Sequence, residues 1–330
     1  MNILITGASG FIGSFIVEEA LRQNMTVWAA MRKTSSKRYL TDSRINFIEL
    51  NLDSQKELTE QLTGLNLDYV VHAAGATKCL RASDFNRVNT DGTRNLALAI
   101  RQTQPGLKKF VFISSLSIYG PVKDLHPDED IKSTDTPMPD TLYAKSKLAA
   151  EEFLDTLDDF PCVTLRPTGV YGPRETDYFM MAKSIKSHTD FSVGYRPQQL
   201  TFIYVKDLVQ AVFKAIEKGA NGSKYILSDG NTYSSRTFSD LLCREMGNPW
   251  VLRIKAPIWV LRIVTWIGEY AGRARGKVTA LNNDKYNIMK QRNWRCDITP
   301  AREELGYKPE FDLDRGVTEA MKWYKENGWL

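Results

Sequence analysis

Residues 2–23 read NILITGASGFIGSFIVEEALRQ, and this stretch decides the fold. The short run Asn2–Thr6 predicts a strand, three glycines follow it, and residues 15–23 have the apolar spacing of a helix. Glycine lets the backbone turn sharply and approach a pyrophosphate, and a helix N-terminus offers free N–H groups to phosphate. The order strand, glycine turn, helix therefore predicts a dinucleotide-binding loop.

The glycine spacing is G-x-x-G-x-x-G, which differs from the G-x-G-x-x-G of other dinucleotide folds. A tight turn that binds no ligand is the alternative interpretation. We expect the pyrophosphate to be held by this loop, whose candidate residues are Gly7, Ser9, Gly10, Phe11, Ile12 and Gly13.

The run Thr26–Met31 predicts the second strand, and the residues after it bear on the choice of cofactor. An NAD site usually has an acid there to hold the ribose diol. This chain has Arg32 instead, followed by further cations and hydroxyl residues up to residue 38. A guanidinium binds a 2′-phosphate through paired charge-assisted hydrogen bonds. The sequence therefore predicts NADP in preference to NAD, with Arg32 as the contact; a solvated basic loop is the alternative.

Further strands are predicted at residues 45–50, 69–72, 110–114 and 163–165, each separated from the next by a helical pattern. Strands that alternate with helices indicate an α/β fold, a parallel sheet with helices on both faces. Ser83 is expected to cap one of these helices. The residues at two strand ends are candidate cofactor contacts: Asn51 and Leu52 beside adenine, and the small residues Ala73, Ala74 and Gly75.

The second half of the chain has no phosphate motif, so we expect it to build the substrate side. Asp207 is predicted to cap a helix that ends at Gly219, and a final helix is predicted to follow Asp314. The predicted organisation is a dinucleotide-binding domain of residues 1–172, with residues 198–230 packing back onto it, and a smaller substrate-binding part of residues 173–197 and 231–330.

Composition points to a soluble globular protein: of 330 residues, 42% are hydrophobic and 25% are charged. The net charge of +5 comes from scattered residues, so no nucleic-acid partner is expected. The chain starts directly on the first strand without a signal peptide, which predicts a cytoplasmic protein. No metal site is expected, because the three histidines and the four cysteines have no metal-ligand spacing: Cys79, Cys162, Cys243 and Cys296.

The apolar run at residues 258–267 is about half the length needed to span a bilayer, and it contains Arg262. Trp259 and Trp266 are seven residues apart and share roughly one helix face. We expect a buried helix or a pocket wall that closes over an apolar substrate. A weak contact with a membrane surface is the alternative, and no transmembrane segment is predicted.

A candidate catalytic pair is Tyr143 and Lys147, in a helix predicted at residues 142–154. Side chains at i and i+4 share a helix face, and a nearby cation is expected to lower the pKa of a phenol. The pattern Tyr-x-x-x-Lys also occurs at Tyr119 and at Tyr286, so the pattern alone is weak. Gly120-Pro121 interrupts the first of these copies.

Taken in order, these motifs resemble the extended short-chain dehydrogenases/reductases, the NAD-dependent epimerase/dehydratase family. The resemblance covers nearly the whole chain and implies a Rossmann-type sheet and a homodimer formed through the helices after Ser83 and Leu142. It also implies roles for residues that match the family's motifs. These are Ser115, Tyr143 and Lys147 in catalysis, and Asn89, Pro167, Thr168, Gly169 and Val170, with Tyr143 and Lys147, at the cofactor.

The branch of the family decides the substrate class. Sugar-nucleotide dehydratases place Asp-Glu after the catalytic Ser/Thr, where this chain has Leu116-Ser117. Epimerases tend to carry Arg-Asp where this chain has Leu200-Thr201. The C-terminal part looks more like the dihydroflavonol-reductase and 3β-hydroxysteroid-dehydrogenase branch. We therefore expect an NAD(P)-dependent oxidoreductase acting on an apolar secondary alcohol or ketone; a sugar-nucleotide epimerase and a non-catalytic dinucleotide sensor are the alternatives.

Overall fold

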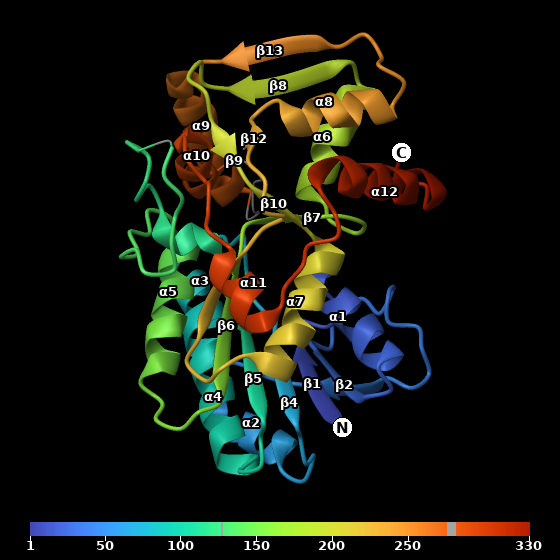
Figure 1. Ribbon diagram of the computed structural model, residues 1–330, viewed down its shortest axis with the longest axis vertical. Coiled ribbons are helices and arrows are strands. Elements are labelled where there is room, and N and C mark those ends of the chain that lie inside the picture. The colour runs from blue at the N-terminus through green and yellow to red at the C-terminus, as the bar shows by residue number, and fades with distance from the viewer. Residues whose placement is uncertain (127, 276–281) are drawn as a thin grey trace.

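A computed structural model of the protein describes residues 1–126, 128–275 and 282–330. Its centre is a seven-stranded sheet of order β11-β6-β5-β4-β1-β2-β3 in which every pairing is parallel (Figure 1). The predicted α/β sheet is thus confirmed. The strands are β1 (Asn2–Thr6), β2 (Thr26–Met31), β3 (Asn46–Glu49), β4 (Tyr69–His72), β5 (Lys109–Ile113), β6 (Cys162–Pro167) and β11 (Lys224–Leu227).

Helices cover both faces of this sheet, because successive side chains of a strand point to opposite faces. In β1, Ile3 and Ile5 pack into the core formed with α1 (Phe11–Arg22) and α7 (Val205–Lys218). Leu4 packs into the opposite core. The helices of that second core are α2 (Gln55–Leu62), α4 (Gly92–Thr103) and α5 (Leu142–Asp155).

The strand order reverses beside β1, where the sheet continues to β2 on one side and to β4 on the other. In open parallel sheets, ligands bind at such a switch point, outside the carboxyl ends of the strands. The glycine loop after β1 and the small residues after β4 both lie at this edge.

The second half adds a smaller layer above the carboxyl ends of the strands (Figure 1). Its core is aromatic, with Tyr171, Phe202, Tyr204 and Phe238 packed together. The helices of this half are α6 (Asp177–Lys186), α8 (Thr237–Glu245), α9 (Ile258–Ala274), α10 (Asn283–Lys290), α11 (Thr299–Leu305) and α12 (Leu313–Glu326).

Three two-stranded sheets of this half were not predicted from the sequence. The parallel pair β8 (Thr189–Val193) and β13 (Leu252–Ala256) joins segments about sixty residues apart. The other two sheets are β7 (Gly169–Tyr171) with β10 (Phe202–Tyr204), and β9 (Gln199–Leu200) with β12 (Tyr233–Ser234).

Several predicted helix starts were wrong. Ser83 lies inside the short helix α3 (Ala82–Phe85), which continues through a π-helix, η1 (Asn86–Asp91), into α4. Asp207 lies in the first turn of α7, and its carboxylate accepts hydrogen bonds from the backbone N–H groups of Glu310 and Phe311, at 2.9 and 3.0 Å. Asp312, two residues before Asp314, caps α12. The carboxylate of Asp207 thus binds a segment that is distant in the sequence, and the cap of α12 is Asp312 instead of Asp314.

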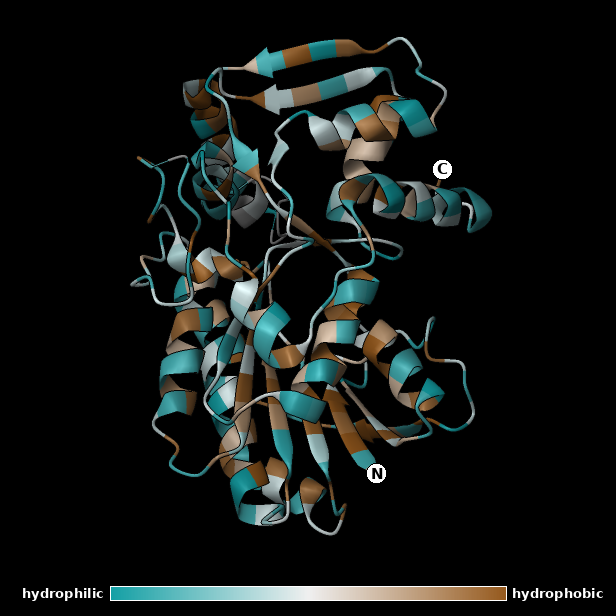
Figure 2. Cartoon of the chain, viewed as in Figure 1, coloured by the Kyte–Doolittle hydropathy of each residue, from teal (hydrophilic) through white to brown (hydrophobic). Residues whose placement is uncertain are grey.

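One of the two expectations for residues 258–267 was wrong: Trp259 and Trp266 are 65% and 70% exposed, so neither side chain is buried in the core. That this helix closes over an apolar substrate stays a prediction. The apolar residues of α9 are visible in Figure 2 at the end of the molecule away from the N-terminus. Among the described residues, no helix is both long and apolar enough to cross a membrane.

Candidate functional site

The glycine loop makes a close turn between β1 and α1. Gly7 has a φ of +67°, and a Cβ there would lie 2.8 Å from the carbonyl oxygen of Ala73. A Cβ on Gly13 would clash with the carbonyl of Gly7, so neither position accepts a side chain. Helix α1 begins at Phe11, four residues earlier than predicted, and its N-cap Gly10 provides no side-chain cap. Its first N–H groups, in the turn that also holds Ser9 and Ile12, are therefore available to a phosphate.

The end of β2 lies beside this loop, because the backbone N–H of Ala8 donates to the carbonyl of Ala30 at 3.4 Å. Arg32 follows β2 directly and is exposed. No hydrogen bond or ion pair from the described residues engages its guanidinium, so its side chain is free to meet a ligand.

The residues expected beside adenine are engaged locally. The side chain of Asn51 accepts from the backbone N–H of Asp53 at 3.1 Å and donates to Glu57 at 3.0 Å. The backbone carbonyl of Leu52 accepts from the side chain of Asn95 at 2.9 Å. These contacts fix the turn after β3 but leave the side chain of Asn51 exposed at the surface.

Asn89 joins the end of β4 to α5. It is fully buried in the π-helix η1, a type of helix frequently found at functional sites. Its amide accepts from the backbone N–H of Ala76 at 2.7 Å and donates to the hydroxyl of Ser146 at 2.9 Å. The loop of Ala73, Ala74 and Gly75 is held by this bond and by one from the N–H of Ala74 to Thr6.

Lys147 lies buried between β5 and the loop after β4. Its ammonium donates to the carbonyl of Ile113 at 2.8 Å, and a Cβ on Gly75 would stand only 3.2 Å from it. Burial lowers the pKa of Lys147 to about 8, because it disfavours the charged form, while the charge of Glu151 acts in the opposite direction. The space beside Gly75 is thus lined by a buried cation.

Tyr143 and Ser115 meet at the carboxyl end of β5. Ser115 caps the 3-10 turn η2 (Leu116–Tyr119) and shares a 2.8 Å hydrogen bond with Ser117. Burial raises the pKa of Tyr143 to about 12, and a hydrogen bond with Ser115 is the contact that lowers it. The expectation that Lys147 brings the phenol pKa down was therefore wrong for this arrangement, in which burial dominates. At neutral pH the phenol is protonated and is fit to donate a proton.

A carboxylate from the second half of the chain accepts hydrogen bonds from the first N–H groups of α5. Asp284, on α10, accepts from the backbone N–H groups of Leu142 and Tyr143 at 3.0 and 3.1 Å. Thr141 accepts from the N–H of Ala144 at 3.0 Å. Two caps therefore satisfy the N-terminus of α5, and one of them places α10 directly over Tyr143.

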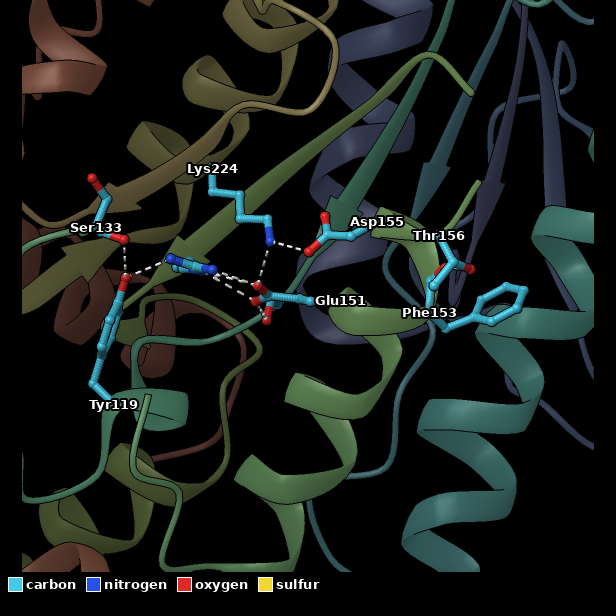
Figure 3. A network of polar contacts seen from close by, with 9 residues as sticks. Tyr119, Ser133, Glu151, Phe153, Asp155, Thr156 and Lys224 are labelled. Carbon is cyan, nitrogen blue, oxygen red and sulfur yellow. Dashed lines mark hydrogen bonds and ion pairs between the residues drawn. The ribbon is translucent and has the colours of Figure 1, made fainter. Parts of the chain in front are cut away.

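A buried ionic network joins α5 to β6 and to the turn η2 (Figure 3). Glu151, on the same helix as Lys147, accepts from Nη2 of Arg166 at 2.6 Å and from the hydroxyl of Ser114. Arg166 also donates to the hydroxyl of Tyr119, which in turn donates to the carbonyl of Ser133. Tyr119 is therefore committed to this network, which leaves Tyr143 as the phenol beside Ser115.

The segment predicted beside the nicotinamide follows β6. Pro167 ends that strand, and the hydroxyl of Thr168 donates to the carbonyl of Thr201 at 2.9 Å. Gly169 and Val170 begin β7, where Gly169 packs closely against the hydroxyl of Tyr178. This segment connects the sheet to the second half of the chain at the edge where the glycine loop lies.

A cavity of about 290 Å³ opens beside the loop after η2. Gln291 lines it and is almost fully buried; its Nε2 donates to the carbonyl of Gly120, and its Oε1 has no partner. The Nε of Arg292, also in the wall, is likewise unpartnered among the described residues. Gln291 and Arg292 thus contribute a neutral amide and a charged guanidinium to the lining of the cavity.

Comparison with known proteins agrees with this geometry. Residues 3–228 match the family described as "NAD dependent epimerase/dehydratase family". The chain belongs to this family. Its members carry out hydride chemistry, and the chain is an enzyme of the extended short-chain dehydrogenase type that uses a nicotinamide dinucleotide.

Individual relatives span different activities. The chain is 25% identical to the decarboxylating sterol-4-alpha-carboxylate 3-dehydrogenase of Candida albicans, with 99% of this chain and 98% of the relative covered. It is 26% identical to the UDP-glucose 4-epimerase of Vibrio cholerae, with 97% and 94% covered. The dTDP-glucose 4,6-dehydratase DesIV of Streptomyces venezuelae, solved with NAD bound, superposes with a TM-score of 0.80 at 20% identity, with 100% and 98% covered.

The sequence alone did not identify three parts of the site. Glu151 stands one turn after Lys147, and an acid at that spacing on a buried helix was a usable signal. Asp284 and Gln291 had no signal, because their partners Tyr143 and Gly120 lie 141 and 171 residues away in the sequence.

Proposed function

We propose that the protein is an NADP(H)-dependent oxidoreductase that interconverts an apolar secondary alcohol and its ketone. The observation that carries this proposal is the meeting of Ser115, Tyr143 and Lys147 beside the small residues after β4. A non-catalytic sensor needs the glycine loop but not these three side chains, so it is the weakest alternative.

The residues present fit a dinucleotide. The turn at Gly7 and Gly13 leaves room for a pyrophosphate, which the free N–H groups of α1 would hold. Lys147 would bind the nicotinamide ribose in the space beside Gly75. The bound cofactor supplies or accepts the hydride.

Tyr143 and Ser115 would transfer the proton and position the carbonyl group of the substrate. Tyr143, protonated at neutral pH, donates its proton to the alkoxide in reduction and takes it back in oxidation. Ser115 donates a hydrogen bond to the substrate oxygen and is itself oriented by Ser117. Lys147, held by the carbonyl of Ile113 beside Gly75, would contribute its positive charge at the cofactor and not to the pKa of the phenol.

The preference for NADP rests on Arg32. The exposed guanidinium beside the glycine loop, with no carboxylate at the end of β2, supports recognition of a 2′-phosphate. NAD is the alternative cofactor.

The substrate class rests on the cavity and on the sterol relative. Apolar side chains of Val193, Ile258 and Met289 line the cavity, beside the unpartnered groups of Gln291 and Arg292. Arg196 and Lys290 also line the cavity, so a mostly apolar molecule that carries an acidic or carbonyl oxygen would suit this lining. A homodimer formed through the helices after Ser83 and Leu142 stays a prediction.

A turnover assay tests this function. Purified protein is incubated with NADP or NAD and with hydroxysteroids, hydroxysteroid carboxylates or UDP-sugars, and reduced nicotinamide is followed by absorbance. We expect reduction of NADP with the steroid alcohols, and a loss of about two to four orders of magnitude in turnover for Tyr143→Phe. Interconversion of UDP-sugars without net reduction of the cofactor would establish the epimerase alternative instead.

A further inference from the structure

Helix α9 turns an apolar stripe away from the protein. The exposed side chains Trp259, Ile263, Trp266 and Tyr270 follow one another at spacings of four, three and four residues, so they share one face. The opposite face, with Leu261 and Thr265, is buried. The exposed fractions of 65%, 70% and 71% for Trp259, Trp266 and Tyr270 are unusual for aromatic residues of this size.

A second apolar surface lies at the same end of the molecule. In the sheet of β8 and β13, Phe191 pairs in register with Ile254, and Leu252 follows on the same face. Phe191 and Leu252 are 61% and 50% exposed. The other face is covered by α8, whose Asp240 receives a 2.8 Å hydrogen bond from Arg253. Figures 1 and 2 show these strands and α9 at the end distant from the N-terminus.

The charges around this surface are mostly positive. Lys255, Arg262 and Arg275 are exposed basic residues of this region, and Glu269 is the acid of α9. The carboxylate of Glu269 accepts from the backbone N–H of Asn283 at 3.2 Å. Lys255 and Arg262 are exposed beside the apolar side chains.

We propose that this surface, the outer faces of α9 and of the β8–β13 sheet, docks the enzyme onto an anionic phospholipid membrane. Indole and phenol rings suit the boundary between head groups and acyl chains, and nearby cations are attracted to anionic lipids. Helix α9 has 17 residues. Its length is about 26 Å at 1.5 Å per residue. With Arg262 in its second turn and an apolar stripe along one side, it lies in the membrane plane and does not cross the bilayer.

The positive charge distinguishes a membrane from a second copy of the chain. Two copies placed face to face on this surface would bring two positively charged surfaces together, which is unfavourable. An anionic lipid surface complements the same charges. Ile258, the first residue of α9 and the neighbour of Trp259 in the sequence, lines the cavity.

Co-sedimentation of the full chain with vesicles tests the proposal. The vesicles are phosphatidylcholine alone, or phosphatidylcholine mixed with phosphatidylglycerol, and bound protein is measured against lipid concentration. We expect binding to the mixed vesicles that weakens with added salt. Exchanging the two exposed indoles for serine, in Trp259→Ser/Trp266→Ser, should weaken that binding by about tenfold or more.

Two control variants separate the contributions. Leu125→Ser removes a side chain that is 86% exposed outside this surface, and its binding should equal that of the wild type. Lys255→Glu/Arg262→Glu should lose the preference for anionic lipid. Melting temperature and NADP binding, measured on every variant, report whether the fold is kept. The proposal would be overturned if the wild-type protein bound neither kind of vesicle, or if Trp259→Ser/Trp266→Ser bound the mixed vesicles as well as the wild type. A dimer that depends on Trp266 and does not bind lipid would also overturn it.

Discussion

Removing one partner of the buried ion pair of Glu151 and Arg166 should destabilise the fold by a measurable amount. Glu151 is 1% exposed and Arg166 is 4% exposed, so both charges are shielded from water. Glu151 receives hydrogen bonds from Nε of Arg166 at 3.1 Å and from Nη2 at 2.6 Å. The change Glu151→Gln keeps the shape of the side chain but removes its charge. Arg166 then keeps the amide oxygen of the introduced glutamine and the hydroxyl of Tyr119 as acceptors, but no carboxylate neutralises its charge.

Breaking a buried pair in this way typically costs about 3–5 kcal/mol, because the remaining charge is uncompensated. We expect Glu151→Gln to lower the free energy of unfolding by that amount. Urea unfolding followed by circular dichroism measures it. The matched control is Glu151→Met/Arg166→Met, which removes both charges and should be less destabilising than the single variant.

The same variant reports on Lys147. The charge of Glu151 raises the pKa of that ammonium, against the lowering effect of burial. In Glu151→Gln the pKa of Lys147 should fall further below 8, and the pH profile of turnover should shift toward acid. A free energy of unfolding within about 1 kcal/mol of the wild type would refute the reasoning, because a buried guanidinium without its carboxylate should destabilise the fold by more than that.

Three further predictions concern other parts of the chain. Arg32→Ala should weaken NADP binding much more than NAD binding, because only NADP has the 2′-phosphate; equal wild-type affinities in calorimetry would contradict this. Asp284→Ala should cost about 1 kcal/mol in urea unfolding, as the loss of a helix cap does, with Asp284→Asn costing less, and an unchanged midpoint would show that the cap is dispensable. Burial lowers the pKa of His72 to about 3 from 6.5, so the unfolded state binds its proton first as the pH falls below 6.5, and folding stability is lost on acidification. His72→Gln should therefore lose less unfolding free energy than the wild type between neutral pH and about pH 5, by about 2 kcal/mol, measured by urea titrations at both pH values.

Local sequence patterns determined the nucleotide-binding half of the protein. Strands β1, β2 and β4 have the predicted bounds, because a buried parallel strand is a short apolar run between turn residues. The glycine loop and the spacing of Tyr143 and Lys147 were readable for the same reason. Each depends on residues within one turn or one strand, whose geometry the sequence specifies directly.

The tertiary structure decided what depends on distant segments. Asp284 accepts a hydrogen bond at the start of α5 although it lies 141 residues away in the sequence, and no local pattern predicts that contact. The pKa of Tyr143 follows from burial by the whole surrounding structure, which outweighs the nearby lysine expected to control it. The periodicity of α9 correctly placed Trp259 and Trp266 on one face, but periodicity does not tell which face the rest of the protein covers. That depends on which elements pack beside the helix, and here they cover the opposite side.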